Sequence, residues 1–321
     1  MSDSSPTEPA GRRVLVLAHT GRAEVRDVAR ACVKALTGHG IAVRLLSNEA
    51  RDLGLGEDAA GGLVETTDPD DVPGEGCELA LVIGGDGSIL RAAELTHETS
   101  TPLLGVNLGH VGFLAEAEQE DVESTIAAIV ARAYTAEDRL TLDVQVFHGK
   151  EVVWSTFALN EASVEKAARE RMLEVVVEVD GRPLSRWGCD GVVCATPTGS
   201  TAYNFSAGGP VVWPEVEALL MVPLSAHALF ARPMVVAPTS VLAVEILANT
   251  GSGVLWCDGR RTVDLPPGAR IEVRRGARPV RLVRLHQAPF TDRLVAKFDL
   301  PVEGWRGAAE RRRRDHSDTD A

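Results

Sequence analysis

Short apolar runs alternate with segments of helical periodicity in the first part of the chain. Val14–Ala18 is a run of the kind that forms a buried parallel strand, and apolar residues from Val25 to Leu36 then recur at helical spacing. Three more apolar runs follow, with a helix-like segment at 88–96 between the last two: Ile41–Leu46, Leu79–Ile83 and Leu103–Val106. This β-α-β order predicts an α/β domain with a Rossmann-like, doubly wound parallel sheet.

The pattern changes to alternation of apolar and polar positions from Leu140 onward. Alternating apolar side chains occupy 142–146, 152–154 and 175–179, and the last of these runs ends at the turn pair Asp180-Gly181. Strands of this kind predict a second, β-rich domain. Within the first domain, the Gly- and acid-rich segment from Gly54 to Gly76 is interpreted as a loop.

Composition and charge narrow the class of protein. Hydrophobic residues make up 45% of the 321 residues and charged residues 25%, which is typical of a globular protein. The net charge of -13 argues against nucleic acid or a membrane surface as a partner, although a local arginine cluster could still bind a small anion. No apolar run is long enough for a membrane span and Met1–Ala10 does not resemble a signal peptide, so we expect a cytoplasmic protein. The five cysteines lack metal-ligand spacing, so no protein metal centre is expected.

The first candidate for chemistry is Gly84-Gly85-Asp86-Gly87-Ser88, which lies directly between an apolar strand and a helix. Open α/β sheets bind ligands at this end of a strand. Glycines allow backbone N–H groups to approach phosphate, and Asp86 could accept a hydroxyl proton or act through a metal ion. The pattern favours phosphoryl transfer to an alcohol. A tight turn with Asp86 as a helix N-cap is the structural alternative.

The second candidate is the polar run from Thr196 to Pro210, which follows the apolar strand 192–195. Its small hydroxyl and glycine residues suit a binding cradle, and Tyr203 and Phe205 could stack on a base or a nicotinamide ring. A surface loop is the alternative. Asn160-Glu161 and Asp190-Gly191 stand at the ends of apolar strands, where each pair could also be a cap or a turn.

In this order, the motifs resemble those of the NAD kinase family, and the resemblance extends from about Val14 to Arg306. Further matching segments are Asn107-Leu108-Gly109, Gly112-Phe113-Leu114 and His227 to Pro233. The resemblance implies an enzyme that phosphorylates the adenosine-ribose 2′-hydroxyl of NAD, with ATP or polyphosphate as the phosphoryl donor.

The resemblance also implies a role for particular residues. Asp86 would be the catalytic carboxylate that acts on the ribose hydroxyl. The positions implied to bind the substrate are Asp86, Gly87, Arg91, Asn160, Glu161, Arg171, Asp190, Thr201, Ala202, Tyr203, Asn204, Phe205 and Ser206. For Arg91 and Arg171, a solvated arginine is the alternative.

Domain organisation and partners follow from the same resemblance. An α/β domain at 13–138 would precede a β-rich, NAD-binding domain at 139–287, and a segment at 288–306 would return to the first domain. The polar ends, 1–12 and 307–321, are expected to be flexible. The family also implies a homo-oligomer, a dimer or a tetramer, and a divalent cation, Mg²⁺ by expectation, that is carried with the donor.

Two positions depart from what many family members carry. Arg260 stands where glutamine is frequent, so no ligand contact is carried over to it. Gly188 stands where some relatives have an arginine near the nicotinamide half of the substrate. Because glycine offers neither charge nor bulk, we expect both NAD and NADH to be phosphorylated.

Two other functions compete with this interpretation. Lipid kinases of the diacylglycerol and sphingosine type share the Gly-Gly-Asp-Gly loop on a related fold, but they lack the run from Asp190 to Pro210. A non-catalytic NAD(P)-sensing module would use the same cradle, but binding alone gives no reason for a carboxylate at Asp86.

Overall fold

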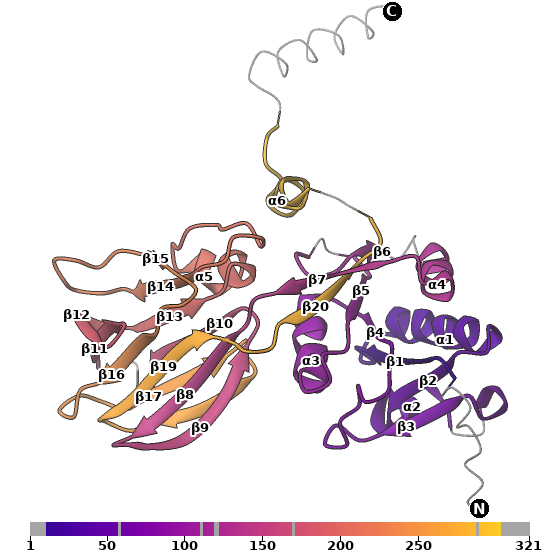
Figure 1. The fold of residues 1–321 in the computed structure, drawn as a ribbon, viewed down its shortest axis with the longest axis horizontal. Helices are drawn as coiled ribbons and strands as arrows, with labels where there is room; N and C mark the ends of the chain where they lie inside the picture. The colour runs from indigo at the N-terminus through magenta and orange to yellow at the C-terminus, as the bar shows by residue number, and fades with distance from the viewer. Residues whose placement is uncertain are drawn as a thin grey trace, which may run out of the picture.

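The computed structural model describes residues 11–56, 59–109, 112–118, 122–168, 171–286 and 289–302. An α/β part and a β-rich part lie side by side, and α6 (Phe290–Phe298) lies above their junction (Figure 1). The ends expected to be flexible lie outside the described residues, apart from Gly11 and Arg12. Arg12 is held in place, contrary to expectation, because its guanidinium donates to the carboxylate of Glu78 and to the carbonyl of Val130.

The α/β part is built on one sheet in the order β3-β2-β1-β4-β5-β20-β7, with β6 paired to β5. Its strands are β1 Arg13–Ala18, β2 Ala42–Leu46, β3 Val64–Thr67, β4 Leu79–Ile83, β5 Leu103–Asn107, β6 Ala117–Glu118, β7 Thr135–Arg139 and β20 Val280–Arg284. Neighbouring strands pair in parallel except β20 and β7. The predicted parallel sheet is therefore confirmed, with one antiparallel edge strand.

Helices cover both faces of this sheet. They are α1 Ala23–Gly38, α2 Ser47–Leu53, α3 Asp86–Thr96 and α4 Val122–Ala131. Val14 and Val16 face the core with α1, α2 and α4, whereas Leu15 and Leu17 face the core with α3, since side chains alternate along a strand. Phe157 of the β-rich part joins the α3 core, so the junction is packed. None of the described helices is long and apolar enough to cross a membrane.

The β-rich part consists of two antiparallel sheets, β15-β14-β13-β10-β17-β18 and β12-β11-β16-β19-β8-β9. Their strands are β8 Leu142–His148, β9 Glu151–Ala158, β10 Glu161–Lys166, β11 Leu173–Val179, β12 Arg182–Cys189, β13 Gly191–Ala195, β14 Leu219–Leu224, β15 Met234–Val236, β16 Leu242–Ile246, β17 Gly253–Cys257, β18 Arg261–Leu265 and β19 Ala269–Arg275. The alternating apolar residues of 142–146 and 175–179 are buried in one core between the sheets. Asp180 and Gly181 both have left-handed φ values, 52° and 70°, as a tight hairpin turn requires. The predicted β-rich part is confirmed.

Several elements differ from the sequence-based expectation. The segment interpreted as a loop, 54–76, contains β3 and the short 3₁₀ helix η1 (Ala59–Gly62). β3 has one fully buried apolar residue, Val64, and is paired only with β2 as an edge strand, so no apolar run marks it. β20 belongs to the first sheet, so the chain returns there before residue 288. β20 is a short strand that mixes apolar residues with two arginines, so nothing in the sequence separates it from the preceding strands of the second domain.

Candidate active site

The glycine-rich turn after β4 lies at the carboxyl edge of the parallel sheet. Gly84 has φ of 152°, and a Cβ there would lie 2.3 Å from the Ser88 hydroxyl oxygen, so only glycine fits. The N–H of Gly84 donates to the carbonyl of Val106 at the end of β5. The turn is thereby fixed between two buried strands, where open α/β sheets present ligands.

Asp86 is the first residue of α3, and its carboxylate is held by a neighbouring loop. Its oxygens accept the backbone N–H groups of Phe113, at 3.0 Å, and Leu114, at 3.1 Å. A Cβ at Gly112 would lie 2.3 Å from the Asp86 carboxylate, which explains the glycine there. The helix N-cap position belongs to Gly85, so the N-cap alternative for Asp86 is wrong. Each carboxylate oxygen keeps lone pairs for a hydroxyl proton or a cation.

Two cavities adjoin this turn and share His19 and Gly85. The first, of about 330 Å³, contains Asp86 and lies toward the Asn107–Gly109 loop. The second, of about 340 Å³, is lined by Leu17, Ala18, His19, Gly85, Gly87, Ser88, Arg91 and Arg260. We call it the Arg91–Arg260 cavity. Gly87 and Arg91, two residues expected at the site, therefore lie next to Asp86.

Arg91 is anchored rather than freely solvated. Its Nη1 donates to Glu49 Oε1 at 2.6 Å, and the same buried carboxyl also accepts the N–H of Ala18. Burial raises the pKa of Glu49, although the N–H of Ala18 and the Arg91 cation oppose this shift. The guanidinium of Arg91 is thus fixed at the cavity wall by α2 and β1.

The Asn160-Glu161 pair packs directly against the polar run. The carbonyl of Asn160 accepts the N–H of Thr196 at 2.9 Å, and a Cβ at Gly199 would lie 2.0 Å from that carbonyl oxygen. The Asp258 carboxylate accepts the N–H groups of residues 159, 160 and 161, and it is ion-paired with Arg261 at 2.6 Å. Two motifs far apart in the sequence therefore form one rigid unit.

Glu161 has the environment of a ligand-binding group. It is 8% exposed, and its Oε2 has no hydrogen-bond partner among the described residues. Burial, with a smaller contribution from the charge of Asp258, raises the pKa of Glu161 to about 8, while the backbone N–H of Tyr203 opposes this shift. A buried carboxyl without a full set of partners costs stability, so its presence favours a role in binding.

The polar run forms η3 (Thr198–Thr201) and the one-turn helix α5 (Tyr203–Ser206). Tyr203, Phe205 and Ser206 are exposed, and Thr201 and Ala202 are half-buried. Asn204 is fully buried, and its amide donates to the carbonyls of Ser200 and Pro210, so in this structure it holds the loop together.

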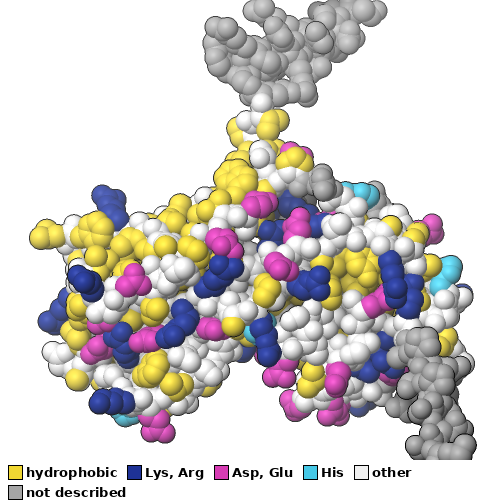
Figure 2. Space-filling view, in the orientation of Figure 1, with side chains coloured by type: hydrophobic (Ala, Val, Ile, Leu, Met, Phe, Trp, Pro, Cys, Tyr) yellow, Lys and Arg dark blue, Asp and Glu magenta, His cyan; other side chains and the backbone are white. Residues whose placement is uncertain are grey.

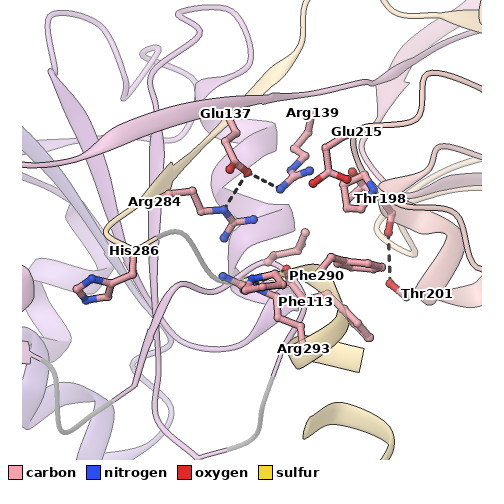
Figure 3. A pocket seen from close by; sticks show the side chains of 13 residues that line it. Phe113, Glu137, Arg139, Thr198, Thr201, Glu215, Arg284, His286, Phe290 and Arg293 are labelled. Carbon is pink, nitrogen blue, oxygen red and sulfur yellow. Dashed lines mark hydrogen bonds and ion pairs between the residues drawn. The ribbon is translucent and has the colours of Figure 1, made fainter. Parts of the chain in front are cut away.

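A third cavity, of about 380 Å³, lies between the two parts and joins Thr198 and Thr201 to Phe113 and Leu114 (Figure 3). Its opposite wall carries three arginines from β7, β20 and the α6 segment: Arg139, Arg284 and Arg293. Glu137 accepts hydrogen bonds from Arg139 at 2.6 Å and Arg284 at 3.0 Å. Burial, followed by repulsion from Arg284, lowers the pKa of Arg139.

Sequence reasoning missed this arginine cluster. Arg139 lies more than a hundred residues before Arg284 and Arg293, and it meets Arg284 because β20 pairs with β7. Isolated arginines at strand ends carry no local pattern that marks a site. Phe113 and Leu114 were recognised as part of a matching motif, but their contact with Asp86 depends on the fold.

Two expected site residues lie elsewhere. Asp190 precedes β13 and is ion-paired with Lys166 at 2.6 Å, and the hydrogen bond from Lys166 lowers the pKa of Asp190. Since Thr196 follows the same extended strand, roughly 20 Å separates it from Asp190. Arg171 is exposed between β10 and β11. Neither residue lines the three cavities described above.

This fold and these motifs define a two-domain kinase with a carboxylate at the junction of its domains. The model for the ATP-NAD kinase N-terminal domain matches residues 14–134, and that for the ATP-NAD kinase C-terminal domain matches residues 159–285. The chain therefore belongs to the NAD kinase family, and it is an enzyme with NAD kinase activity.

Individual relatives agree with this assignment. NAD kinase 2 of Streptomyces avermitilis is 59% identical over 94% of this chain and 99% of its own length. The NAD kinase of Mycobacterium leprae strain TN is 53% identical over 94% of this chain and 99% of its own length. Yeast NADH kinase complexed with NADH has the same fold, with a TM-score of 0.82 and 23% identity over 92% of this chain and 89% of that one. An NAD kinase from Archaeoglobus fulgidus in complex with ATP has a TM-score of 0.66 and 25% identity over 89% of this chain and 98% of that one.

Proposed function

We propose that this chain transfers the terminal phosphoryl group of its donor to the adenosine-ribose 2′-hydroxyl of NAD, with Asp86 as the catalytic carboxylate. The observation that supports this role is the carboxylate's position, fixed by two backbone N–H groups and open to a cavity on the sheet's ligand-binding edge. The hydroxyl oxygen attacks the terminal phosphorus, and Asp86 accepts its proton. The bond from phosphorus to the bridging oxygen then breaks, and the shortened donor leaves with the electron pair.

The second domain and the third cavity supply the features that NAD requires. Glu161 accepts the N–H of Tyr203 in the run Thr201–Ser206, and Phe298 of α6 contacts both Phe205 of this run and Phe113. Phe113 and Phe290 offer aromatic faces to a base, and the arginines beside them offer N–H donors to a diphosphate. The loop 112–116 connects Asp86 with this part of the second domain.

A divalent cation fits the site as a companion of the donor. Among the described residues, no group of three or more His, Cys, Asp or Glu side chains could hold a metal ion. Asp86 keeps lone pairs for one cation contact, and donor phosphates with water can complete an octahedral Mg²⁺ shell. When bound, such a cation would supply positive charge to the phosphate oxygens of the donor.

The proposal includes assembly of identical subunits, as a dimer or a tetramer. Figure 2 shows hydrophobic side chains gathered along the upper edge of the β-rich part, over β14 and β15. Exposed apolar residues in this region include Trp213, Val216, Leu229, Phe230 and Val235. An apolar surface of this kind is typical of an interface.

A coupled assay tests the proposed reaction. Purified protein is incubated with NAD, Mg²⁺ and either ATP or polyphosphate, and NADP is measured with an NADP-specific dehydrogenase. NADP formation with either donor supports the proposal. Phosphorylation of diacylglycerol or sphingosine instead would indicate a lipid kinase, and binding of NAD without turnover would indicate a sensor. Size-exclusion chromatography with light scattering measures the molar mass of the assembly. A monomer at micromolar concentration would contradict the proposed oligomer.

A further inference from the structure

The carboxylate of Asp258 is buried beside the Asn160-Glu161 pair and lines none of the three cavities described above. Its Oδ1 accepts the N–H of Asn160 at 2.7 Å and that of Glu161 at 3.3 Å, and its Oδ2 accepts the N–H of Leu159 at 2.9 Å. The contacts of this side chain are therefore directed at the backbone between β9 and β10, which carries a motif expected to bind the substrate.

Arg261 connects Asp258 with the first domain. Its Nη2 lies 2.6 Å from Asp258 Oδ2, and its Cζ lies 4.2 Å from the centroid of the Phe157 ring. His97 of α3 stacks on the same ring, with the two centroids 3.7 Å apart. Since α3 begins at Asp86, a short series of side-chain contacts joins Asp258 to the helix that carries the catalytic carboxylate.

Asp258 places a negative charge next to a second buried carboxyl. Each of its oxygens faces only N–H donors among the described contacts, which leaves no acceptor for a carboxyl proton, so Asp258 is ionised. Burial, followed by this charge, raises the pKa of Glu161 to about 8. A protonated Glu161 can donate a hydrogen bond from its O–H group, which a carboxylate cannot do.

The other described groups around Glu161 do not supply a compensating charge. β13 places Ala195 opposite Glu161, and the N–H of Tyr203 in α5 donates to the Glu161 carboxyl. Burial raises the pKa of the Tyr203 phenol, and it raises the pKa of the Cys257 thiol on β17 to about 12. Both of these side chains are therefore neutral at physiological pH, and Asp258 is the charged group that acts on Glu161.

We propose that Asp258 is a positioning residue for NAD binding: it orients the Asn160-Glu161 pair and makes Glu161 a hydrogen-bond donor toward an acceptor atom of the substrate. The inference rests on the proposed role of this pair in binding NAD. Because Asp258 acts through Glu161, its effect belongs to the affinity for NAD and to the pH dependence of that affinity. A purely structural Asp258 would stabilise the turn between β17 and β18 and would leave this pH dependence unchanged.

Asp258→Asn distinguishes these two roles, because it keeps an oxygen acceptor for the backbone and removes the charge. Glu161 then ionises at lower pH. Between pH 6 and 7.5 the Kd for NAD should rise less than about twofold in wild type and about fourfold in Asp258→Asn, as expected if the charge moves the titration of Glu161 by about one pH unit. The KM of the phosphoryl donor should stay within about twofold of wild type.

A second variant guards against misfolding. Asp258→Asn leaves the buried Arg261 without its partner, whereas the double variant Asp258→Asn/Arg261→Met removes both charges and should show the same change in pH dependence. Asp264→Asn is the matched control, because it removes an exposed carboxylate from the same β18 strand and should behave like wild type. Glu161→Gln should flatten the pH dependence, since its amide donates at every pH.

The experiment measures NAD binding by calorimetry without donor at several pH values between 6 and 9, followed by KM and kcat at the same values and a thermal melt of each variant. A steeper rise of the NAD Kd in both Asp258 variants supports the inference. Profiles parallel to wild type in both, with only a lower Tm, would overturn it. If Glu161→Gln has the same pH profile as wild type, the proposed role of Glu161 fails as well. If Glu161→Gln alone flattens the profile, only the inference about Asp258 fails.

Discussion

The role proposed for Asp86 depends on two neighbouring glycines that leave room around its carboxylate. Gly84 and Gly112 leave no side chain where the carboxylate and Ser88 lie, so the loop 112–114 approaches closely enough for its N–H groups to bind both oxygens. Neutral backbone donors fix the direction of a carboxylate without pairing its charge with a cation. The proposed proton acceptor for the ribose hydroxyl is thus held in a fixed orientation.

Asp86→Asn should lower kcat by about two to four orders of magnitude, because loss of a general base has an effect of this size. The amide cannot take the hydroxyl proton, and only its oxygen can accept one of the two loop N–H groups. The KM for NAD should change little, and circular dichroism should show an intact fold. Turnover within about threefold of wild type would contradict the catalytic role.

Glu161 should make stability depend on pH. Its native pKa is raised to about 8 from a usual value of 4.5, so between these values the native state holds a proton that the unfolded state has released. The free energy of unfolding should therefore fall as pH rises through this window, by at most about 1.4 kcal/mol per pH unit. Glu161→Gln should flatten this dependence in urea titrations at pH 6 and 8.5.

Asp190→Asn serves as the matched control for that experiment. The pKa of Asp190 is lowered by Lys166, so this residue is ionised in both states between pH 6 and 8.5 and its replacement should leave the slope unchanged. An equal slope in wild type and Glu161→Gln would show that Glu161 is ionised in the folded protein across this range.

At the scale of elements, the sequence predicted those that carry a repeated pattern. β4 was recognisable because a strand buried on both faces is apolar throughout. β11 was recognisable because a strand buried on one face alternates apolar and polar residues. β3 and β20 were not, since one is a short edge strand and the other pairs with partners far away in the chain. The glycine-rich turn was found as a motif. Two other features could be recognised only from the three-dimensional structure: the loop that holds Asp86, and the arginine cluster.

α6 connects the candidate site to both parts of the molecule. Phe298 stacks on Phe205 with ring centroids 4.7 Å apart, and Phe290 contacts Trp213. Arg293 donates from Nη1 to the carbonyl of Ala115 at 2.5 Å and from Nη2 to Glu116. Because the same loop binds the Asp86 carboxylate through residues 113 and 114, α6 helps to fix the position of this carboxylate.

Arg293→Met should therefore lower kcat by about tenfold, since a small misplacement of a catalytic group is costly. Arg293→Lys should recover part of the loss by keeping one contact to the loop. Asp292→Asn, an exposed change on the same helix, is the control and should behave like wild type. Equal kcat values for Arg293→Met and wild type would show that α6 does not affect the orientation of Asp86.

At the scale of the whole molecule, the site is assembled from both domains and from the returning end of the chain. Gly-Gly-Asp-Gly, the 112–116 loop, the Asn160-Glu161 unit and α6 meet at one junction. Asp190 remains roughly 20 Å from Thr196 within one chain, so it lies well away from the Thr196 end of the polar run. Residues near Asp190 are then candidates for contact with the half of NAD that lies farthest from Asp86.

Gly188, two residues before Asp190, leads to the last prediction. It lies in β12, its carbonyl accepts the N–H of His227, and a Cβ there would meet only the Cε atom of Met172, at 2.9 Å, the far end of a flexible side chain. Gly188 itself contributes no cation that could repel the charged ring of NAD. It also has no bulk to exclude the puckered ring of NADH.

We therefore expect both NAD and NADH to be phosphorylated, with kcat/KM values within about a hundredfold of each other. A larger ratio would require more than about 2.7 kcal/mol of differential transition-state binding, and the strand around Gly188 carries no charged group at Trp187 or Cys189 to supply it. Gly188→Arg should shift the ratio toward NADH because the added cation repels the positive nicotinamide ring, whereas Gly188→Ala should leave it unchanged. Kinetics with both substrates, for wild type and the two variants, decide the matter. A ratio above a hundredfold in wild type, or one that Gly188→Arg does not alter, would show that this strand takes no part in substrate choice.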